Sequence, residues 1–142
     1  MALTTLERSQ LLDRVDLFAG LGGDPMMAIA ERAIEVDFPA GHTIARQGEI
    51  GTGFFLIVRG RAKVVHDGQV LARLGPGEFF GELSLLDQMP RIASVLAEEP
   101  TTCLAIAGWD FDQLLEAQPS MAVAILRTVA RRLRAVTDLH RH

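Results

Sequence analysis

The spacing of apolar residues changes twice along the chain and divides it into three parts. Residues 4–32 have the spacing of amphipathic helices, with Thr4 or Thr5 as the expected N-cap of the first one. Over residues 33–107 apolar and polar residues alternate, which is typical of strands. Helical spacing returns over residues 109–139 and predicts two C-terminal helices.

Turn residues break the middle part into short segments of strand length. Gly and Pro separate most of these segments, and Asp67-Gly68 is a strong signal for a two-residue hairpin. The predicted strands are Ile34 to Phe38, Thr43 to Arg46, Gly53 to Val58, Arg61 to His66, Gln69 to Leu74, Ile92 to Ala97 and Thr102 to Ala107. Such strands indicate an antiparallel β jelly-roll barrel. The predicted fold is mainly β, with an N-terminal helical bundle and two C-terminal helices flanking the barrel in a single domain over residues 1–142.

Composition narrows the range of functions. The chain has 142 residues, 49% of them hydrophobic, which is ordinary for one globular domain. A net charge of −4 argues against nucleic acid as the main partner, so we expect no direct DNA binding. Uncharged runs fall far short of the ~20 residues that cross a bilayer, and no signal peptide is evident. We therefore expect a cytoplasmic protein without membrane insertion. The single cysteine, Cys103, is expected to be buried and inert.

The stretch from Gly75 to Val95 carries the candidate chemistry. It is apolar and rich in glycine, yet it contains Glu82 and Arg91. A guanidinium can bind two phosphate oxygens at once, whereas a carboxylate accepts a hydrogen bond from a neutral hydroxyl such as a ribose 2′-OH. Free amides at the start of a helical turn over Leu83 to Leu86 would also face an anion. From these residues alone, a surface ion pair between Glu82 and Arg91 is the alternative.

The wider pattern resembles a known cassette. F-G-E-L-S-L-L, four further residues and R-x-A-S-V are similar to the phosphate-binding cassette of the cyclic nucleotide-binding domain family. That family includes the bacterial catabolite activator, the regulatory subunit of the cAMP-dependent kinase and cyclic-nucleotide-gated channels. Two upstream segments, PAGHTIARQGE (Pro39 to Glu49) and FFLIVRGRAKVV (Phe54 to Val65), resemble its early strands. The resemblance covers roughly Leu17 to Leu139.

The resemblance implies a role for particular residues. Arg91 would contact the cyclic phosphate and Glu82 the ribose 2′-OH, with backbone groups of Gly81, Leu83, Ser84 and Ile92 completing these contacts. Val64 and Leu71 match apolar positions that face the base, although simple alternation puts Leu71 on the same face as Arg73. The lid would come from the last helix, through Arg132, Leu133, Val136 and Thr137. Domains that favour cGMP often carry a hydroxyl where this chain has Ile92, so cAMP is the expected ligand and cGMP the less favoured one.

The expected function is a stand-alone cAMP sensor that transmits occupancy through its helices to an unknown protein effector. The chain stops at His142 without a helix-turn-helix, so it acts on a partner in trans or is a fragment of a larger protein. The apolar series Ala122, Leu126, Val129, Leu133 and Val136 indicates either a homodimer through the last helix or a helix packed on its own barrel.

Two other functions are alternatives. One is a ligand-free dimerisation or docking module of the same fold. The other is a metalloenzyme of the cupin type, for which the chain offers only His42, His66, His140 and His142. We expect no enzyme, no catalytic residue and no metal.

Overall fold

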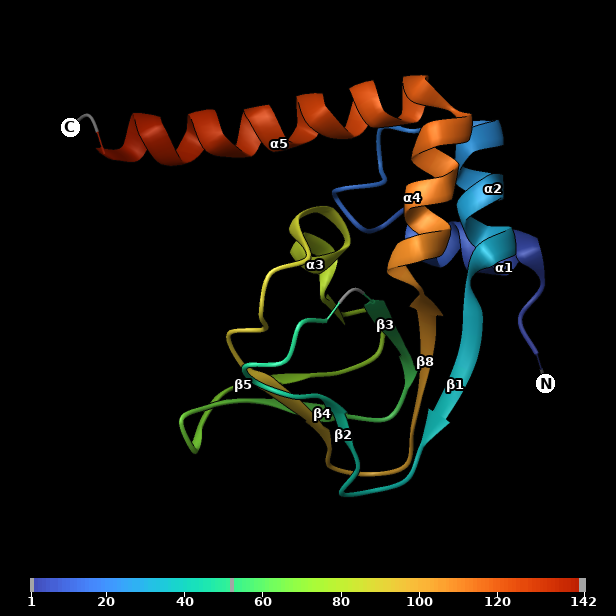
Figure 1. Cartoon of the computed structure of the whole chain (residues 1–142). Helices are drawn as coiled ribbons and strands as arrows, with labels where there is room; N and C mark the ends of the chain where they lie inside the picture. Colours follow the sequence, from blue (N-terminus) through green and yellow to red (C-terminus); the bar gives the residue numbers. More distant parts are fainter. Residues whose placement is uncertain (1, 52, 141–142) are drawn as a thin grey trace.

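The structure is a computed structural model that describes residues 2–51 and 53–140 (Figure 1). The helices are α1 (Thr5–Leu12), α2 (Gly23–Arg32), α3 (Glu82–Asp87), α4 (Gly108–Ala117) and α5 (Pro119–His140). The strands are β1 (Ile34–Phe38), β2 (Thr43–Ala45), β3 (Phe54–Arg59), β4 (Ala62–His66), β5 (Gln69–Leu74), β6 (Phe79–Phe80), β7 (Ser94–Ala97) and β8 (Thr101–Ile106).

The strands form two antiparallel sheets. The first has the order β1-β8-β3-β6 and the second the order β2-β7-β4-β5. In the first sheet, β8 lies between β1 and β3, pairing Cys103 with Val36 on one side and with Ile57 on the other. Antiparallel sheets with flanking helices are thus confirmed, and the alternating pattern of residues 33–107 predicted most of the strands.

The first sheet is covered on both faces. Every residue of β8 is buried, with Leu104 and Ile106 in the cluster beneath the helices and Cys103 in the cluster shared with the second sheet. Phe54 and Leu56 of β3 join the helical cluster, and the same cluster contains Phe18, Ile29 and Phe111 from the helical parts of the chain. A strand that is buried on both faces needs apolar residues on both, and this explains the apolar run Cys103 to Ile106, whereas the buried hydroxyls of Thr101 and Thr102 at the start of β8 form hydrogen bonds.

The N-terminal helices begin and end where the local sequence favours it. Thr4 caps α1 by accepting a hydrogen bond from the Glu7 amide, and the Glu7 side chain accepts one from the Thr4 amide. These bonds lower the pKa of the Glu7 carboxyl. The sequence predicts a second helix that begins near Asp24-Pro25 with Asp24 as its cap, but α2 begins at Gly23, its N-cap is Gly22, and Asp24 and Pro25 lie in its first turn.

The last helix is anchored at its start and extends away from the rest of the molecule (Figure 1). Met121 and Ile125 are buried in the helical cluster, and Thr128 is buried beside them. The predicted apolar series is largely on another face, because Leu126, Leu133 and Val136 are exposed. The start of α5 therefore packs on its own domain through residues next to the predicted series.

The buried thiol gives a test of this packing. Burial raises the pKa of Cys103 to about 12, because the thiolate would lose its hydration. We expect the folded protein to resist a thiol-specific reagent at pH 8 and to react only on unfolding. As the pH rises, the unfolded chain loses the thiol proton first, so stability falls from about pH 9 towards pH 12. Chemical denaturation should show a shallower fall in Cys103→Ala, and rapid labelling of the folded protein would contradict the packing.

Candidate functional site

Backbone hydrogen bonds hold Arg91 against the loop that precedes β3. The Arg91 amide donates to the Glu49 carbonyl at 2.8 Å, and the Gly48 amide donates to the Arg91 carbonyl at 2.8 Å. Pro90 forms an isolated bridge with Ile50. Because these residues pair with the loop, β7 begins at Ser94 and not at Ile92, where the sequence predicts it.

The guanidinium of Arg91 lies close to the backbone of two loops. Its Nη2 donates to the Gly53 carbonyl at 2.9 Å. A Cβ atom on Gly51 would lie 1.8 Å from Nε, and one on Gly81 would lie 2.4 Å from the Gly53 carbonyl oxygen. Gly81 also has a φ of +84°, which favours glycine. Burial lowers the pKa of Arg91, yet a guanidinium keeps its charge in proteins.

A cavity of about 340 Å³ lies on one side of Arg91. It brings together eight residues predicted from the sequence: Val64, Leu71, Gly81, Glu82, Leu83, Ser84, Arg91 and Ile92. Phe79, Phe80, Ala93 and Val95 complete the lining. Its volume falls within the usual range of small-molecule sites, about 300–1,000 Å³. Arg91 also borders a second cavity of about 350 Å³, lined in part by Arg46, Glu49 and Ile50. Only the first cavity contains both Glu82 and Arg91, so it is the candidate site.

A β-bulge brings Leu71 to the cavity. Val64 pairs with Ala72, but the next residue, Val65, pairs with Val70, so Leu71 is the extra residue of β5. A bulge changes the direction of a side chain relative to simple alternation. This explains how Leu71 lines the cavity although the sequence pattern places it on the face of Arg73.

The rim of the cavity is open to solvent. Ile92 is 83% exposed, and Leu71 and Leu83 are exposed as well. The carbonyl of Ile92 lies 2.6 Å from Nδ1 of His66, which links this residue to the end of β4. The apolar rim side chains therefore surround an accessible opening.

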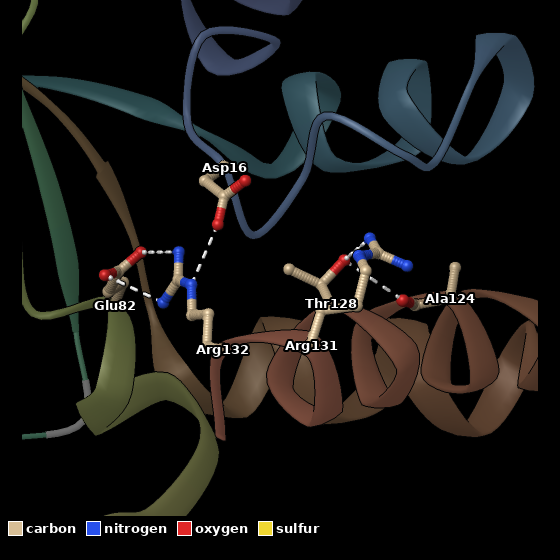
Figure 2. A network of polar contacts seen from close by, with 6 residues as sticks. All are labelled: Asp16, Glu82, Ala124, Thr128, Arg131 and Arg132. Carbon is tan, nitrogen blue, oxygen red and sulfur yellow. Dashed lines mark hydrogen bonds and ion pairs between the residues drawn. The ribbon is translucent and has the colours of Figure 1, made fainter. Parts of the chain in front are cut away.

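Glu82 pairs with Arg132 of α5 and not with Arg91 (Figure 2). Nη1 and Nη2 of Arg132 donate to the two carboxylate oxygens at 3.1 and 3.2 Å. Nε of the same guanidinium donates to Asp16 at 2.8 Å. Hydrogen bonding to Glu82 is the largest cause of the raised pKa of Arg132, and Asp16 adds to it. Arg132 thus connects α5, the start of α3 and the link between α1 and α2.

The other predicted lid residues lie away from the cavity lining. Leu133 and Val136 are exposed at 66% and 52%, and Thr137 donates its hydroxyl to the Leu133 carbonyl at 2.9 Å. Their role as a lid stays a prediction.

Neither a metal site nor a membrane span is found in the described part of the chain. Within residues 2–51 and 53–140, no cluster of His, Cys, Asp and Glu suits a metal ion. No helix described there is long and apolar enough to cross a bilayer. The pair His140 and His142, weighed for a cupin-type site, lies outside the residues whose side chains are described.

Asp16, Gly51 and Gly53 also shape the site, and none of them is predicted from the sequence as a site residue. Asp16 meets Arg132 from 116 residues away, and no local pattern signals such a contact. Gly51 and Gly53 lie in a short glycine-containing segment before a strand, which was a signal for close backbone approach.

Two antiparallel sheets, a short helix after Gly81 and a cavity containing Glu82 and Arg91 are the features of a domain with a candidate ligand site. The profile of the cyclic nucleotide-binding domain family matches residues 35–118, and the chain belongs to this family.

Relatives with different overall functions share this domain. A CRP-like cAMP-activated global transcriptional regulator of Mycobacterium tuberculosis is 31% identical over 91% of this chain and 60% of its own length. A cyclic nucleotide-gated potassium channel of Rhizobium etli is 36% identical over 87% of this chain and 34% of its own length. The crystal structure of the N-terminal domain of a transcriptional regulator from Streptomyces coelicolor superimposes with a TM-score of 0.83 at 35% identity, covering 91% of this chain and 93% of that one. This chain thus spans less than two thirds of the two curated relatives.

Two glycine substitutions test what holds Arg91 in place. Gly51→Ala should displace the guanidinium, because the new methyl group would overlap Nε. Gly53→Ala is the matched control, since its Cβ would make only ordinary contacts of 3.5 Å or more. The readout is the side-chain Nε–H resonance of Arg91 by NMR, assigned with Arg91→Lys. We expect it to shift or broaden in Gly51→Ala alone. Equal spectra for both variants would show that Gly51 leaves Arg91 unconstrained.

Proposed function

We propose that this chain is a cAMP-binding sensor domain. The observation that carries the proposal is one cavity holding a carboxylate, a guanidinium and an apolar wall. A cyclic nucleotide presents a ribose hydroxyl, a singly charged phosphodiester and a flat base, so each part of the cavity has a matching part of the ligand. Phe79, Phe80 and Val64 provide the apolar wall.

In this proposal the phosphate binds at Arg91. The guanidinium uses Nη2 on the Gly53 carbonyl, and no other side-chain hydrogen bond of Arg91 is found among residues 2–51 and 53–140, so in this proposal its other donors bind the ligand. Its Nη1 lies close to Gly81, at 3.1 Å from the position of a Cβ there, so it is near the start of α3. Amides of Leu83 and Ser84 and the backbone of Ile92 would add contacts.

The ribose binds at Glu82. Each carboxylate oxygen accepts one hydrogen bond from Arg132 and keeps capacity for a second, so a 2′-hydroxyl can bind without displacing Arg132. The base lies against Val64 and Leu71, and the absence of a hydroxyl side chain at Ile92 favours adenine over guanine.

We also propose how the remaining elements serve this site. The two sheets are the walls of a jelly-roll barrel, α1 and α2 form the helical bundle, and residues 1–142 act as one domain. Leu133, Val136 and Thr137 of α5 close over the base when ligand binds. The helices then transmit occupancy to a protein effector in the cytoplasm, without catalysis and without direct contact to DNA.

Ligand titration with an Arg91 variant tests the proposal. Leaving a buried phosphate charge without its partner costs about 3–5 kcal/mol. Arg91→Ala should therefore weaken cAMP binding by roughly two to three powers of ten. Calorimetry measures the affinity, and thermal denaturation with cAMP, cGMP and cyclic dinucleotides identifies the preferred ligand, because a true ligand raises the midpoint with its occupancy.

Arg46→Ala is the matched control for this titration. Arg46 borders the second cavity, is exposed and pairs with Glu49, so its loss should leave cAMP affinity within about twofold. Near-normal affinity in Arg91→Ala would eliminate the phosphate assignment. Absence of any cyclic nucleotide binding by the unmodified protein would favour the ligand-free docking module instead.

A homodimer through α5 is a second proposal, favoured by the exposed side chains of Leu126, Leu133 and Val136. Spacings of seven and three residues place them along one side of the helix.

We expect the protein to sediment as a dimer and Leu133→Glu to halve its mass by placing a charge in the contact. Trp109→Glu, which changes an exposed apolar residue of α4, should remain dimeric. A monomeric parent protein at micromolar concentration would overturn this proposal.

A further inference from the structure

The guanidinium of Arg132 is bound on two edges by two carboxylates. Its Nη1 and Nη2 contact Glu82, and its Nε makes the shorter contact of 2.8 Å to Asp16 (Figure 2). A guanidinium is planar and its donors have fixed directions. A group bound only at its Nη edge can pivot about that edge, whereas a third contact at Nε fixes its plane. Asp16 therefore restricts the direction from which Arg132 meets Glu82.

Within the described residues, Glu82 and Asp16 are the hydrogen-bond partners of the Arg132 side chain. Among the side chains of α5 that are described, it is the last one that is not exposed, because every residue from Leu133 to Thr137 is exposed. Thr128 and Arg131 form a separate pair one turn earlier, in which Arg131 donates to the Thr128 hydroxyl at 3.0 Å (Figure 2). The position of Arg132 thus depends on the two carboxylates that it binds.

We propose that Asp16 is a positioning residue that acts through Arg132 on Glu82. By fixing the guanidinium, it orients the carboxylate that receives the ribose 2′-hydroxyl and so sets how well the site distinguishes ribose from 2′-deoxyribose. The link between α1 and α2 is thereby part of the recognition of the sugar. The ligand in this inference comes from the proposed function, whereas the geometry comes from the contacts of Asp16, Arg132 and Glu82.

Exposure limits the size of the effect. The side chain of Asp16 is 67% exposed, compared with 22% for Glu82 and 33% for Arg132. Exposed ion pairs contribute little, so we expect a change of about two- to fivefold and no loss of binding. Removing a negative charge near an anionic ligand also changes affinity directly. That direct effect is the same for cAMP and 2′-deoxy-cAMP, which carry equal charge, and it cancels in the ratio of their affinities.

The experiment measures this ratio by calorimetry in the full chain. We expect the unmodified protein to prefer cAMP, Glu82→Ala to lose the preference, and Asp16→Asn to reduce it about two- to fivefold. Asp13→Asn is the matched control, because Asp13 is also exposed near the end of α1 and its carboxylate makes no ion pair within the described residues. An unchanged ratio in Asp16→Asn would overturn the inference.

A second background shows whether Asp16 acts through Arg132. In Arg132→Gln, adding Asp16→Asn should change the ratio no further, because the connecting guanidinium is absent. A reduction of the same size in both backgrounds would assign Asp16 to a direct or structural effect and would also overturn the inference.

A measurement without ligand separates this inference from the proposed function. If the unmodified protein binds no cyclic nucleotide, the proposed function fails. Amide hydrogen exchange in α3 then tests whether Asp16 constrains Glu82 through Arg132. We expect exchange at the α3 amides that follow Glu82 to be about two- to fivefold faster in Asp16→Asn than in Asp13→Asn. Equal rates in these two variants would show that Asp16 does not constrain Glu82.

Discussion

The candidate site depends on the pairing between the loop that precedes β3 and the residues around Arg91. The loop contributes three backbone groups: the Glu49 carbonyl and the Gly48 amide bond to the backbone of Arg91, and the Gly53 carbonyl accepts a hydrogen bond from its guanidinium. A side chain on Gly51 or Gly81 would occupy the space that this arrangement requires. The hydrogen bond to Gly53 offsets only part of the cost of burying a charged guanidinium, because burial still lowers the pKa of Arg91. The guanidinium lies at the edge of an apolar cavity.

The sequence predicted the parts of this arrangement that local patterns control. Alternation and turn residues predicted most strands, and the glycine-rich stretch drew attention to Glu82 and Arg91. The resemblance to the phosphate-binding cassette predicted the other six of the eight candidate residues that line the cavity. Contacts set by register or by distant segments were not predictable. The direction of Leu71 depends on a bulge in the pairing of β4 with β5, and alternation alone puts it on the other face. Asp16 and Arg132 meet only because α5 passes the link between α1 and α2.

The last helix shows why a regular pattern can mislead. Two adjacent rows of residues on α5 have helical spacing, and only the row of Met121 and Ile125 is buried in this structure. The row with Leu126 and Leu133 is more regular over the full helix, yet these two residues are exposed, and Val129 of the same row is half-buried against the core. Periodicity identifies a face that favours burial but does not identify what buries it. In this protein the start of α5 packs on the domain, and the more distal apolar residues remain accessible.

The proposed lid and the proposed homodimer share the exposed residues Leu133 and Val136 of α5, so these two proposals together link ligand binding to association. Val136 lies one turn beyond Leu133 on α5. Both residues are close to Arg132, which connects this part of α5 to Glu82 through the hydrogen bonds described above. Closing over a base and packing against a second copy would each remove apolar surface of this segment from water, and each is favoured by roughly 25 cal/mol per Å² of that surface. If ligand binding and association both change the position of this part of α5, each changes the affinity of the other by the same factor. A ligand that holds distal α5 in one position would therefore change the affinity of the copies for each other, and association would change the affinity for the ligand by the same factor.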